Sequence, residues 1–312
     1  MIQRDDVILI TGGSGLAGIH LREYLQSQSF ARVLAPTSAE CDLTDRRAVL
    51  DCFKRNQPDY VFHMAGLVHG IMGHMRNQGE AYLKNTLINT HVIDACHEAG
   101  VKKVVAMGSA AMYPDLEPGI PRTEEDVWKG PPHASEFGYA HAKRGMLAQL
   151  QAYENSYGMP YAFAVSTNLF GPHDRFNLET GHVVPSLVKK FYDAKQAKTP
   201  VTVWGDGSAR RDFLYVKDTA RALHTIMDNI AGPVNLASGD FHRIRDVVNI
   251  LAAYTGMEDQ IVWDTSKTNG QMFRGCDVSR LRAAGFTWHY TLEQALHETY
   301  DWYASHSGDV RH

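Results

Sequence analysis

Residues 7–18 read VILITGGSGLAG, and this stretch decides the fold. Its first four residues are apolar and predict a buried strand, and the glycines after them predict a tight turn that opens a helix over about residues 17–26. A strand, turn and helix of this kind can hold a dinucleotide. The spacing of Gly12, Gly15 and Gly18 departs from GxGxxG, but the demands are the same: a tight turn, access of backbone amides to the pyrophosphate and close packing of helix on strand. An ordinary glycine-rich turn is the alternative, and the position directly after the first strand argues against it.

Apolar strands alternate with helices through the rest of the first half of the chain. Strands are expected at 32–35, 60–64, 104–107 and 161–165, and helices at 46–56, 81–99 and 139–157. Strands that are apolar throughout and separated by helices are typical of a parallel sheet covered on both faces. The sequence therefore predicts an α/β fold, a doubly wound parallel sheet of the Rossmann type, over residues 1–171.

The pattern changes after residue 171, where loops rich in His, Asp, Asn and Gly separate shorter elements. A helix is expected at 184–194, a strand at 201–204 and a terminal helix at 292–304. These features predict a smaller, partly interleaved substrate domain over residues 172–312, with a later segment that returns to the first domain. Such a domain would cover the carboxyl ends of the strands, where ligands bind in sheets of this kind.

Composition excludes several classes of function. The 312 residues are 44% apolar and 21% charged, with a net charge of −4, and both signs are spread along the chain, so no nucleic-acid or membrane surface is expected. The 16 histidines show no clustered metal-ligand spacing, so no metal site is expected. The four cysteines show no paired spacing, and the N-terminus lacks a signal-peptide pattern. We therefore expect a cytoplasmic protein with free thiols.

The end of the second strand bears on the choice of cofactor. An acidic residue there would hold the ribose 2′-hydroxyl of NAD. The chain instead has Thr37 and Ser38, with Arg32 nearby. Uncharged polar groups tolerate a 2′-phosphate, so the sequence favours NADPH, with NADH as the alternative.

Tyr139 and Lys143 are four residues apart in an expected helix, so they share one face of it. An ammonium group beside a phenol stabilises the phenolate, and we expect it to lower the pKa of Tyr139. The phenol can then give a proton to a carbonyl oxygen as hydride arrives, and Ser109 can hold the same oxygen by a hydrogen bond. Tyr-x-x-x-Lys alone is a weak signal. The glycine loop before it and a serine about thirty residues upstream make it a strong one.

Six further segments carry a resemblance to a known family: GPPH at 130–133, FGY at 137–139, TNLFGPHD at 167–174, GHVVP at 181–185, VWG at 203–205 and RRDF at 210–213. The chain resembles the extended short-chain dehydrogenase/reductases and, within them, the GDP-L-fucose synthase family, over nearly its whole length. That family epimerises carbons 3 and 5 of GDP-4-keto-6-deoxy-D-mannose and reduces its 4-keto group. The resemblance implies an NADP-dependent oxidoreductase that acts on a GDP-sugar as a homodimer.

The resemblance also assigns roles to individual residues. It implies that Ser109, Tyr139 and Lys143 perform the reduction and that His182 is the acid of the epimerisation. The positions it implies for the cofactor are Gly12, Gly15, Leu16, Gly18, Thr37, Ser38, Asp42, Leu43 and Lys143, with Asp42 facing the adenine. Those it implies for the GDP-sugar are Asn168, His182, Lys190, Trp204 and Arg211. Simpler interpretations remain for three of them: Asp42 as part of a helix N-cap region, Trp204 as a core residue and His182 as a loop histidine.

Ala111 departs from the family, which has a cysteine at this position. A thiolate suits the base that epimerisation needs, whereas a methyl group accepts no proton. In an extended strand residues 109 and 111 would point to the same side, so we expect Ala111 beside Ser109. Either the protein is a 4-reductase, for a hexose or a heptose, that has lost some or all epimerase activity, or it is a Cys-to-Ala variant of a GDP-L-fucose synthase. The first is favoured. A non-catalytic NADP(H) sensor and a nucleotide-sugar 4-epimerase or dehydratase are more distant alternatives.

Overall fold

A computed structural model describes residues 1–114, 119–178 and 181–310. Its largest sheet has six parallel strands in the order β2-β1-β3-β4-β5-β9. The strands are β1 (Val7–Thr11), β2 (Arg32–Leu34), β3 (Tyr60–His63), β4 (Lys103–Ser109), β5 (Tyr161–Ser166) and β9 (Gly232–Leu236). The strand order reverses at β1, where the chain runs first to β2 on one side and then to β3 on the other. Ligands bind beside such a reversal, at the carboxyl ends of the strands.

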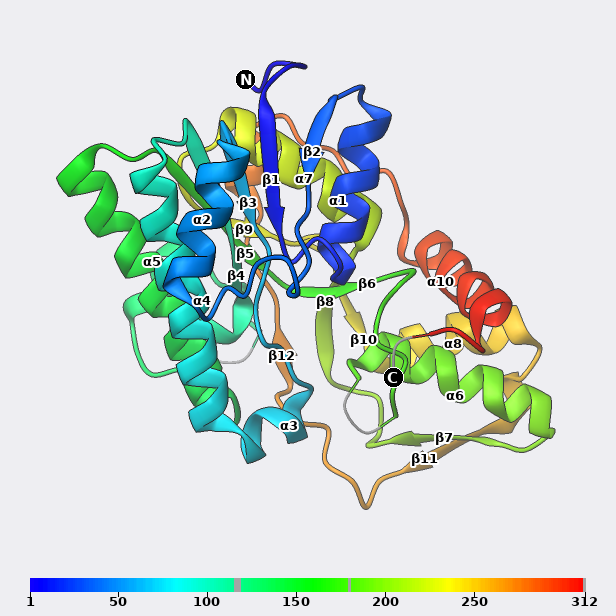
Figure 1. The fold of residues 1–312 in the computed structure, drawn as a ribbon. Coiled ribbons are helices and arrows are strands. Elements are labelled where there is room, and N and C mark those ends of the chain that lie inside the picture. Colours follow the sequence, from blue (N-terminus) through cyan, green and yellow to red (C-terminus); the bar gives the residue numbers. More distant parts are fainter. Residues whose placement is uncertain (115–118, 179–180, 311–312) are drawn as a thin grey trace.

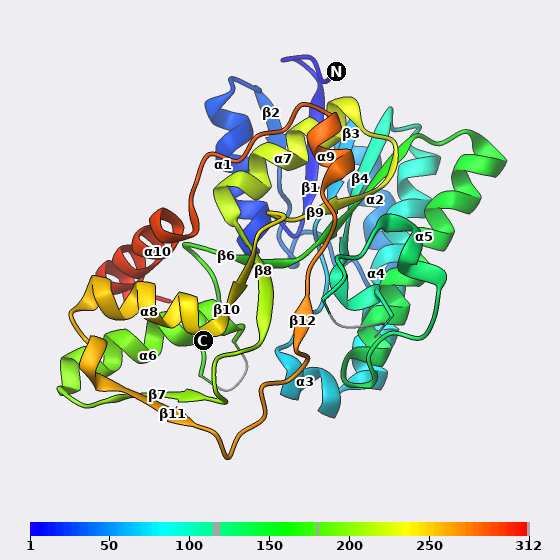
Figure 2. The same ribbon diagram turned by 180° about the vertical axis from the view of Figure 1, so that it is seen from behind.

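Helices cover both faces of this sheet (Figures 1 and 2). Ile8 and Ile10 of β1 face a core formed with α1 and α7, whereas Leu9 between them faces a second core formed with α2, α4 and α5. The helices are α1 (Leu16–Ser27), α2 (Arg46–Asn56), α4 (Gln78–Glu98), α5 (Phe137–Tyr157) and α7 (Val216–Asn229). The predicted doubly wound parallel sheet is therefore confirmed. Because β1 is buried on both sides, its sequence is apolar without alternation.

Most of the remaining elements lie beside the carboxyl ends of the main sheet (Figure 1). A smaller sheet pairs β8 (Arg210–Tyr215) with β6 (Asn168–Phe170), β10 (Phe241–Arg243) and β12 (Phe273–Arg274). A separate pair joins β7 (Val201–Trp204) to β11 (Ile261–Asp264), and the helices here are α6 (Val183–Ala197), α8 (Ile244–Thr255) and α10 (Leu292–His306). There are also two short helices, α3 (Ile71–Arg76) and α9 (Ser279–Ala283), and α9 packs against the main sheet through Leu281. In the chain, α7 and β9 come after β6, α6, β7 and β8. In space, β9 is a strand of the main sheet and α7 packs against that sheet.

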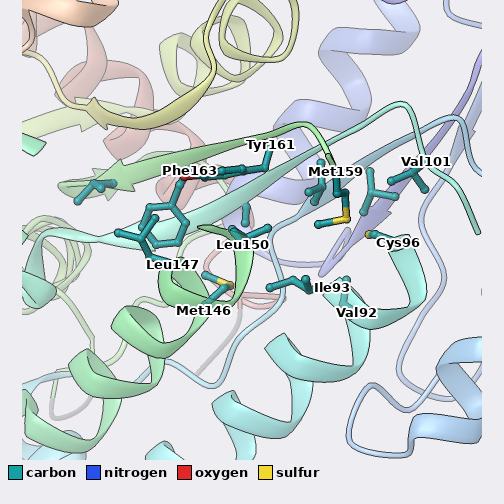
Figure 3. Close-up of a cluster of buried hydrophobic side chains, with 14 of the residues drawn as sticks. Val92, Ile93, Cys96, Val101, Met146, Leu147, Leu150, Met159, Tyr161 and Phe163 are labelled. Carbon is teal, nitrogen blue, oxygen red and sulfur yellow. The ribbon is translucent and has the colours of Figure 1, made fainter. Parts of the chain in front are cut away.

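A buried apolar cluster fixes α5 against α4 and the sheet (Figure 3). Met146, Leu147 and Leu150 of α5 pack here with side chains of α4 and with Phe163 of β5. The ring of Phe163 lies against Gly108 of β4, where a Cβ would come within 2.4 Å of it. This packing sets the position of α5 relative to the end of β4, and both elements carry predicted site residues.

One local expectation is wrong. β4 ends at Ser109, and residues Ala110–Met112 form a 3₁₀ turn instead of continuing the strand. The cause is local: the Ser109 hydroxyl accepts a hydrogen bond from the backbone N–H of Ala111 at 3.2 Å, which folds the chain back. Ser109 and Ala111 therefore do not share one side of an extended strand.

Within residues 1–114, 119–178 and 181–310, no helix is long and apolar enough to cross a membrane. No group of three or more His, Cys, Asp or Glu side chains in the same residues could hold a metal ion.

Candidate active site

The glycine turn after β1 leaves no room for side chains. Gly12 has a φ of +70°, and a Cβ there would lie 2.7 Å from the backbone N and Cα of Ala65. A Cβ on Gly18 would lie 2.3 Å from the Gly12 carbonyl oxygen. Gly15 is the N-cap of α1, with no side-chain cap and no acidic residue in the first turn, so the amides of that turn are available to an anion. These residues fit a dinucleotide pyrophosphate.

We expect Gly12→Ala to lower the free energy of unfolding by about 2–4 kcal/mol, because it combines a left-handed backbone with a clash against Ala65. It should also weaken NADPH binding. Gly145→Ala is the matched control: Gly145 is exposed on α5 and nothing lies within 4 Å of an added Cβ. That change should be neutral or stabilising by up to about 1 kcal/mol. Urea titrations with and without NADPH measure both effects, and equal stabilities of the two variants would contradict the steric argument.

A buried polar chain beneath this turn ties it to the helix of the predicted catalytic residues. The Thr11 hydroxyl lies 2.7 Å from Nδ1 of His63, Nε2 of His63 lies 3.1 Å from Oδ1 of Asn89, and the Asn89 amide donates to the Ala142 carbonyl at 3.3 Å. Burial lowers the pKa of His63 to about 3, so this ring is neutral and serves as a bridge. The chain joins β1, β3, α4 and α5. Sequence reasoning missed it because its members are far apart in the chain.

The predicted adenosine side of the cofactor site lies in the exposed loop after β2. Thr37 and Ser38 are exposed, and the carboxylate of Glu40 accepts hydrogen bonds from the backbone and hydroxyl of Thr37, both at 2.8 Å. Asp42 accepts from Thr44 in the same loop. The Leu43 carbonyl lies 3.1 Å from Nδ1 of His91 on α4. The exposed hydroxyl of Ser38 lies in the same loop.

Two sequence interpretations of this region need correction. Asp45, and not Asp42, is the N-cap of α2, because its side chain accepts from the backbone N–H groups of Arg47 and Ala48. Arg32 is the first residue of β2, at its amino end, where its charge acts on Asp59. Thr37 lies beyond the other end of that strand. Because a strand extends about 3.3 Å per residue, Arg32 is carried away from the loop and does not supply a cation to a 2′-phosphate.

Ser109, Tyr139 and Lys143 come together where β4 ends against α5. Tyr139 and Lys143 are both buried on α5, with the Lys143 Nζ 5.9 Å from the centre of the Tyr139 ring. That ammonium donates to the Met107 carbonyl of β4 at 2.8 Å. A side-chain hydrogen bond joins Ser109 to Tyr139. The tertiary structure thus places a hydroxyl, a phenol and an ammonium at one point above the sheet.

The pKa of Tyr139 has the opposite shift from the one expected. Burial raises the pKa of Tyr139 to about 12, and the hydrogen bond from Ser109 offsets only part of this effect. Burial also lowers the pKa of Lys143 to about 8. The expectation failed because the ammonium is directed at the Met107 carbonyl and not at the phenol oxygen. Tyr139 is therefore a neutral phenol at pH 7, which is the form that can give up a proton.

Ala111 lies against Tyr139 despite the 3₁₀ turn. It is 3% exposed and packs in a small cluster with Ala81, Tyr139 and Ala140. It also lines a small cavity with Tyr113, His133 and Arg274. A thiol in place of its methyl group would be next to the ring of Tyr139, whereas the methyl group offers no acid or base.

The structure adds residues that sequence reasoning did not single out. His74 of α3 is buried with its ring centre 4.7 Å from that of Tyr139. Glu136, just before α5, forms an ion pair with Arg274 of β12 and so joins the main domain to the smaller sheet. His182, the N-cap of α6, is exposed but close enough for its charge to lower the pKa of His74. The signal for His74 was present as a second histidine five residues after His69, but no spacing rule connects it to Tyr139.

The residues predicted for the GDP-sugar line the smaller sheet and its surroundings. Arg211 of β8 is near the Glu136–Arg274 pair, and burial together with the Arg274 charge lowers its pKa to about 10. Lys190 of α6 donates to the Thr202 carbonyl at 2.9 Å and lies 5.2 Å over the ring of Trp204. Trp204 is 55% exposed, which contradicts the core interpretation. The side-chain amide nitrogen of Asn168 donates to the Asp212 carbonyl at 2.8 Å. The side-chain oxygen of Asn168 is therefore the group left to meet a ligand.

Comparison with known proteins decides the family. Residues 8–237 match the model of the "NAD dependent epimerase/dehydratase family". The chain belongs to this family. The match covers the six-stranded sheet, the glycine turn and the Ser109–Tyr139–Lys143 group.

Its relatives narrow this assignment. The chain is 34% identical over 300 residues to "Probable GDP-L-fucose synthase 1" of Oryza sativa subsp. japonica, covering 95% of this chain and 91% of that protein. A solved GDP-L-fucose synthetase from Naegleria fowleri is 32% identical, with a TM-score of 0.90 over 100% of this chain and 97% of that one. A solved GDP-mannoheptose C4 reductase from Campylobacter jejuni with NADP bound is 27% identical, with a TM-score of 0.88 over 97% and 99%. The predicted resemblance to extended short-chain dehydrogenase/reductases of GDP-sugars is thus confirmed, and the chain is an enzyme of this kind.

Proposed function

We propose that this family member is an NADPH-dependent 4-ketoreductase that acts on a GDP-4-keto-6-deoxy sugar, a hexose or a heptose, and that its epimerase activity is lost or reduced. One observation carries the proposal: Ser109, Tyr139 and Lys143, the last two of them buried, come together in a complete group, while the side chain of Ala111 beside them has no proton-accepting atom. Reduction needs the first group, and epimerisation needs a base.

NADPH would supply the hydride, and the chain supplies the rest of the reduction. The amides at the start of α1 and the turn at Gly12 would hold the pyrophosphate, with Thr37, Ser38, Asp42 and Leu43 toward the adenosine. Ser109 would orient the carbonyl oxygen, and Tyr139 would give its phenolic proton to that oxygen. Lys143, whose ammonium is held by the Met107 carbonyl, would hold the ribose. The relatives named GDP-L-fucose synthase and the NADP-bound reductase support this choice of cofactor and substrate class.

The two domains divide these tasks in the proposal. Residues 1–171, with the later segment of α7 and β9, would hold NADPH, and residues 172–312 would bind the GDP-sugar through Arg211, Lys190 and Trp204. We also propose a homodimer, supported by exposed apolar side chains on α4 and α5: Tyr82 is 48%, Leu83 58% and Tyr157 59% exposed.

The test is the reaction of the purified protein with NADPH and GDP-4-keto-6-deoxy-D-mannose in D₂O, with NMR analysis of the product. NADPH oxidation without deuterium at carbons 3 and 5 is the expected result. Deuterium at these carbons with a GDP-fucose product would mean that another group replaces the thiol, and the full synthase would then be the correct function. No oxidation with this substrate or with its heptose counterpart would overturn the reductase proposal.

Ala111→Cys is the companion variant. We expect it to introduce deuterium at carbon 3 or 5 of the substrate, because the new thiol lies beside Tyr139, where the sugar would react. Ala110→Cys is the matched control, since Ala110 is its neighbour in the same 3₁₀ turn and is likewise buried. Exchange that is equal in both variants would show that position 111 has no special access to the sugar.

A further inference from the structure

The two ring nitrogens of His74 differ in their hydrogen bonding. Nε2 lies 3.2 Å from the backbone nitrogen of His69. Nδ1 is buried and has no hydrogen-bond partner among the described residues. A backbone N–H can only donate, so Nε2 must be the acceptor and the neutral ring must carry its proton on Nδ1. His74 therefore presents a buried donor with no acceptor.

The surroundings keep this ring neutral and in place. The titratable and charged groups that face it are Glu136, His69, His182 and Arg274. Burial, together with the charges of His69, His182 and Arg274, outweighs the opposing charge of Glu136, so that the pKa of His74 is lowered to about 4. The His69 side chain occupies the space above Gly73, where a Cβ would lie 2.8 Å from the Cβ of His69. The absence of a side chain at Gly73 thus lets the turn close and deliver the His69 N–H to His74. The ring is built to donate, and neither nitrogen can serve as the base that Ala111 lacks.

The ring that carries this donor packs against Tyr139, the proposed proton donor to the sugar. The His74 ring lies 4.7 Å from the Tyr139 ring, whose hydroxyl would meet the oxygen on carbon 4. The two carbons next to that carbonyl are carbon 3, which bears a hydroxyl, and carbon 5, which bears the ring oxygen, a weaker acceptor. A buried donor without a partner is unfavourable, so a ligand that supplies an acceptor there gains affinity.

On the basis of the proposed function, we propose that Nδ1–H of His74 donates a hydrogen bond to the hydroxyl on carbon 3 of the sugar, and that His74 thereby selects 3-hydroxylated over 3-deoxy 4-keto sugars. His74 is thus a specificity-determining contact of the reductase.

The experiment compares kcat/KM of the wild type and His74→Phe on GDP-4-keto-6-deoxy-D-mannose and on its 3-deoxy counterpart. Phenylalanine retains a ring against Tyr139 and removes the donor. We expect the wild type to prefer the 3-hydroxylated sugar by about 3- to 10-fold, the value of one neutral hydrogen bond, and the variant to have a ratio near one. A ratio that is unchanged in His74→Phe would overturn the inference. His97→Phe is the control. His97 lies in the last turn of α4 and also stacks on a tyrosine, Tyr157. The ratio of kcat/KM values in this variant should match that of the wild type.

A measurement on the wild type keeps the inference testable if His74→Phe does not fold. The ¹⁵N resonance of His74 Nδ1 should respond to GDP-mannose, which has the carbon 3 hydroxyl, and not to GDP alone. An equal response to both would overturn the inference. Failure of the wild type to reduce any GDP-4-keto sugar would instead count against the proposed function, so the two failures are distinguishable.

Discussion

Tyr139→Phe is expected to lower kcat for NADPH oxidation by about 100- to 10,000-fold, the usual contribution of a positioned proton donor. The variant retains the ring that packs against His74 and Ala111 and loses only the hydroxyl that would protonate the carbonyl oxygen. NADPH affinity should change little, because the Lys143 ammonium is held by the Met107 carbonyl and not by the phenol. Single-turnover kinetics and NADPH titration measure the two quantities separately.

Tyr157→Phe is the matched control for this variant. Tyr157 is the last residue of the same helix, is 59% exposed and lies far along α5 from the active site. Its kcat should equal that of the wild type. If Tyr139→Phe also kept the wild-type kcat, the proton donor would be another group, and His182 would be the next to replace.

Arg211→Ala has the second largest expected effect, on the KM for the GDP-sugar. Arg211 is partly buried, and Glu136, the described carboxylate that acts on its pKa, is already paired with Arg274. A guanidinium in this position suits a diphosphate, which it can bind through two parallel hydrogen bonds. Charged hydrogen bonds contribute about 1.5–3 kcal/mol, so KM should rise by about 10- to 100-fold. The kcat should change little if the contact is the same in ground state and transition state.

Arg210→Ala is the control that the strand itself offers. Arg210 is the preceding residue of β8, so its exposed side chain points to the opposite face, and its partner in register on β10 is Arg243. The substitution removes the same charge from the protein with no loss at the diphosphate. We expect an unchanged KM. An equal rise in both variants would mean that the net positive charge of this region, and not a specific contact by Arg211, holds the substrate.

Local sequence determined the main sheet. The run of four apolar residues in β1 is buried on both faces, and the glycines after it meet steric limits that no other residue satisfies, so both were predictable from residue type alone. Helix α5 was predictable as well, and with it the shared face of Tyr139 and Lys143, because i and i+4 positions always coincide on a helix. Family resemblance added the significance of Ala111.

Only the tertiary structure decided the electrostatics and the neighbours of the site. The pKa of Tyr139 is raised because packing buries the phenol. Packing also directs the Lys143 ammonium at the Met107 carbonyl, and no spacing in the sequence encodes either fact. Likewise, His74 reaches Tyr139 through a short helix with no periodic pattern of its own. The sequence by itself thus determined which groups are present and on which elements they lie. Burial and orientation, which set the pKa of each group and its partners, arise from contacts between distant segments and exist only once the chain is folded.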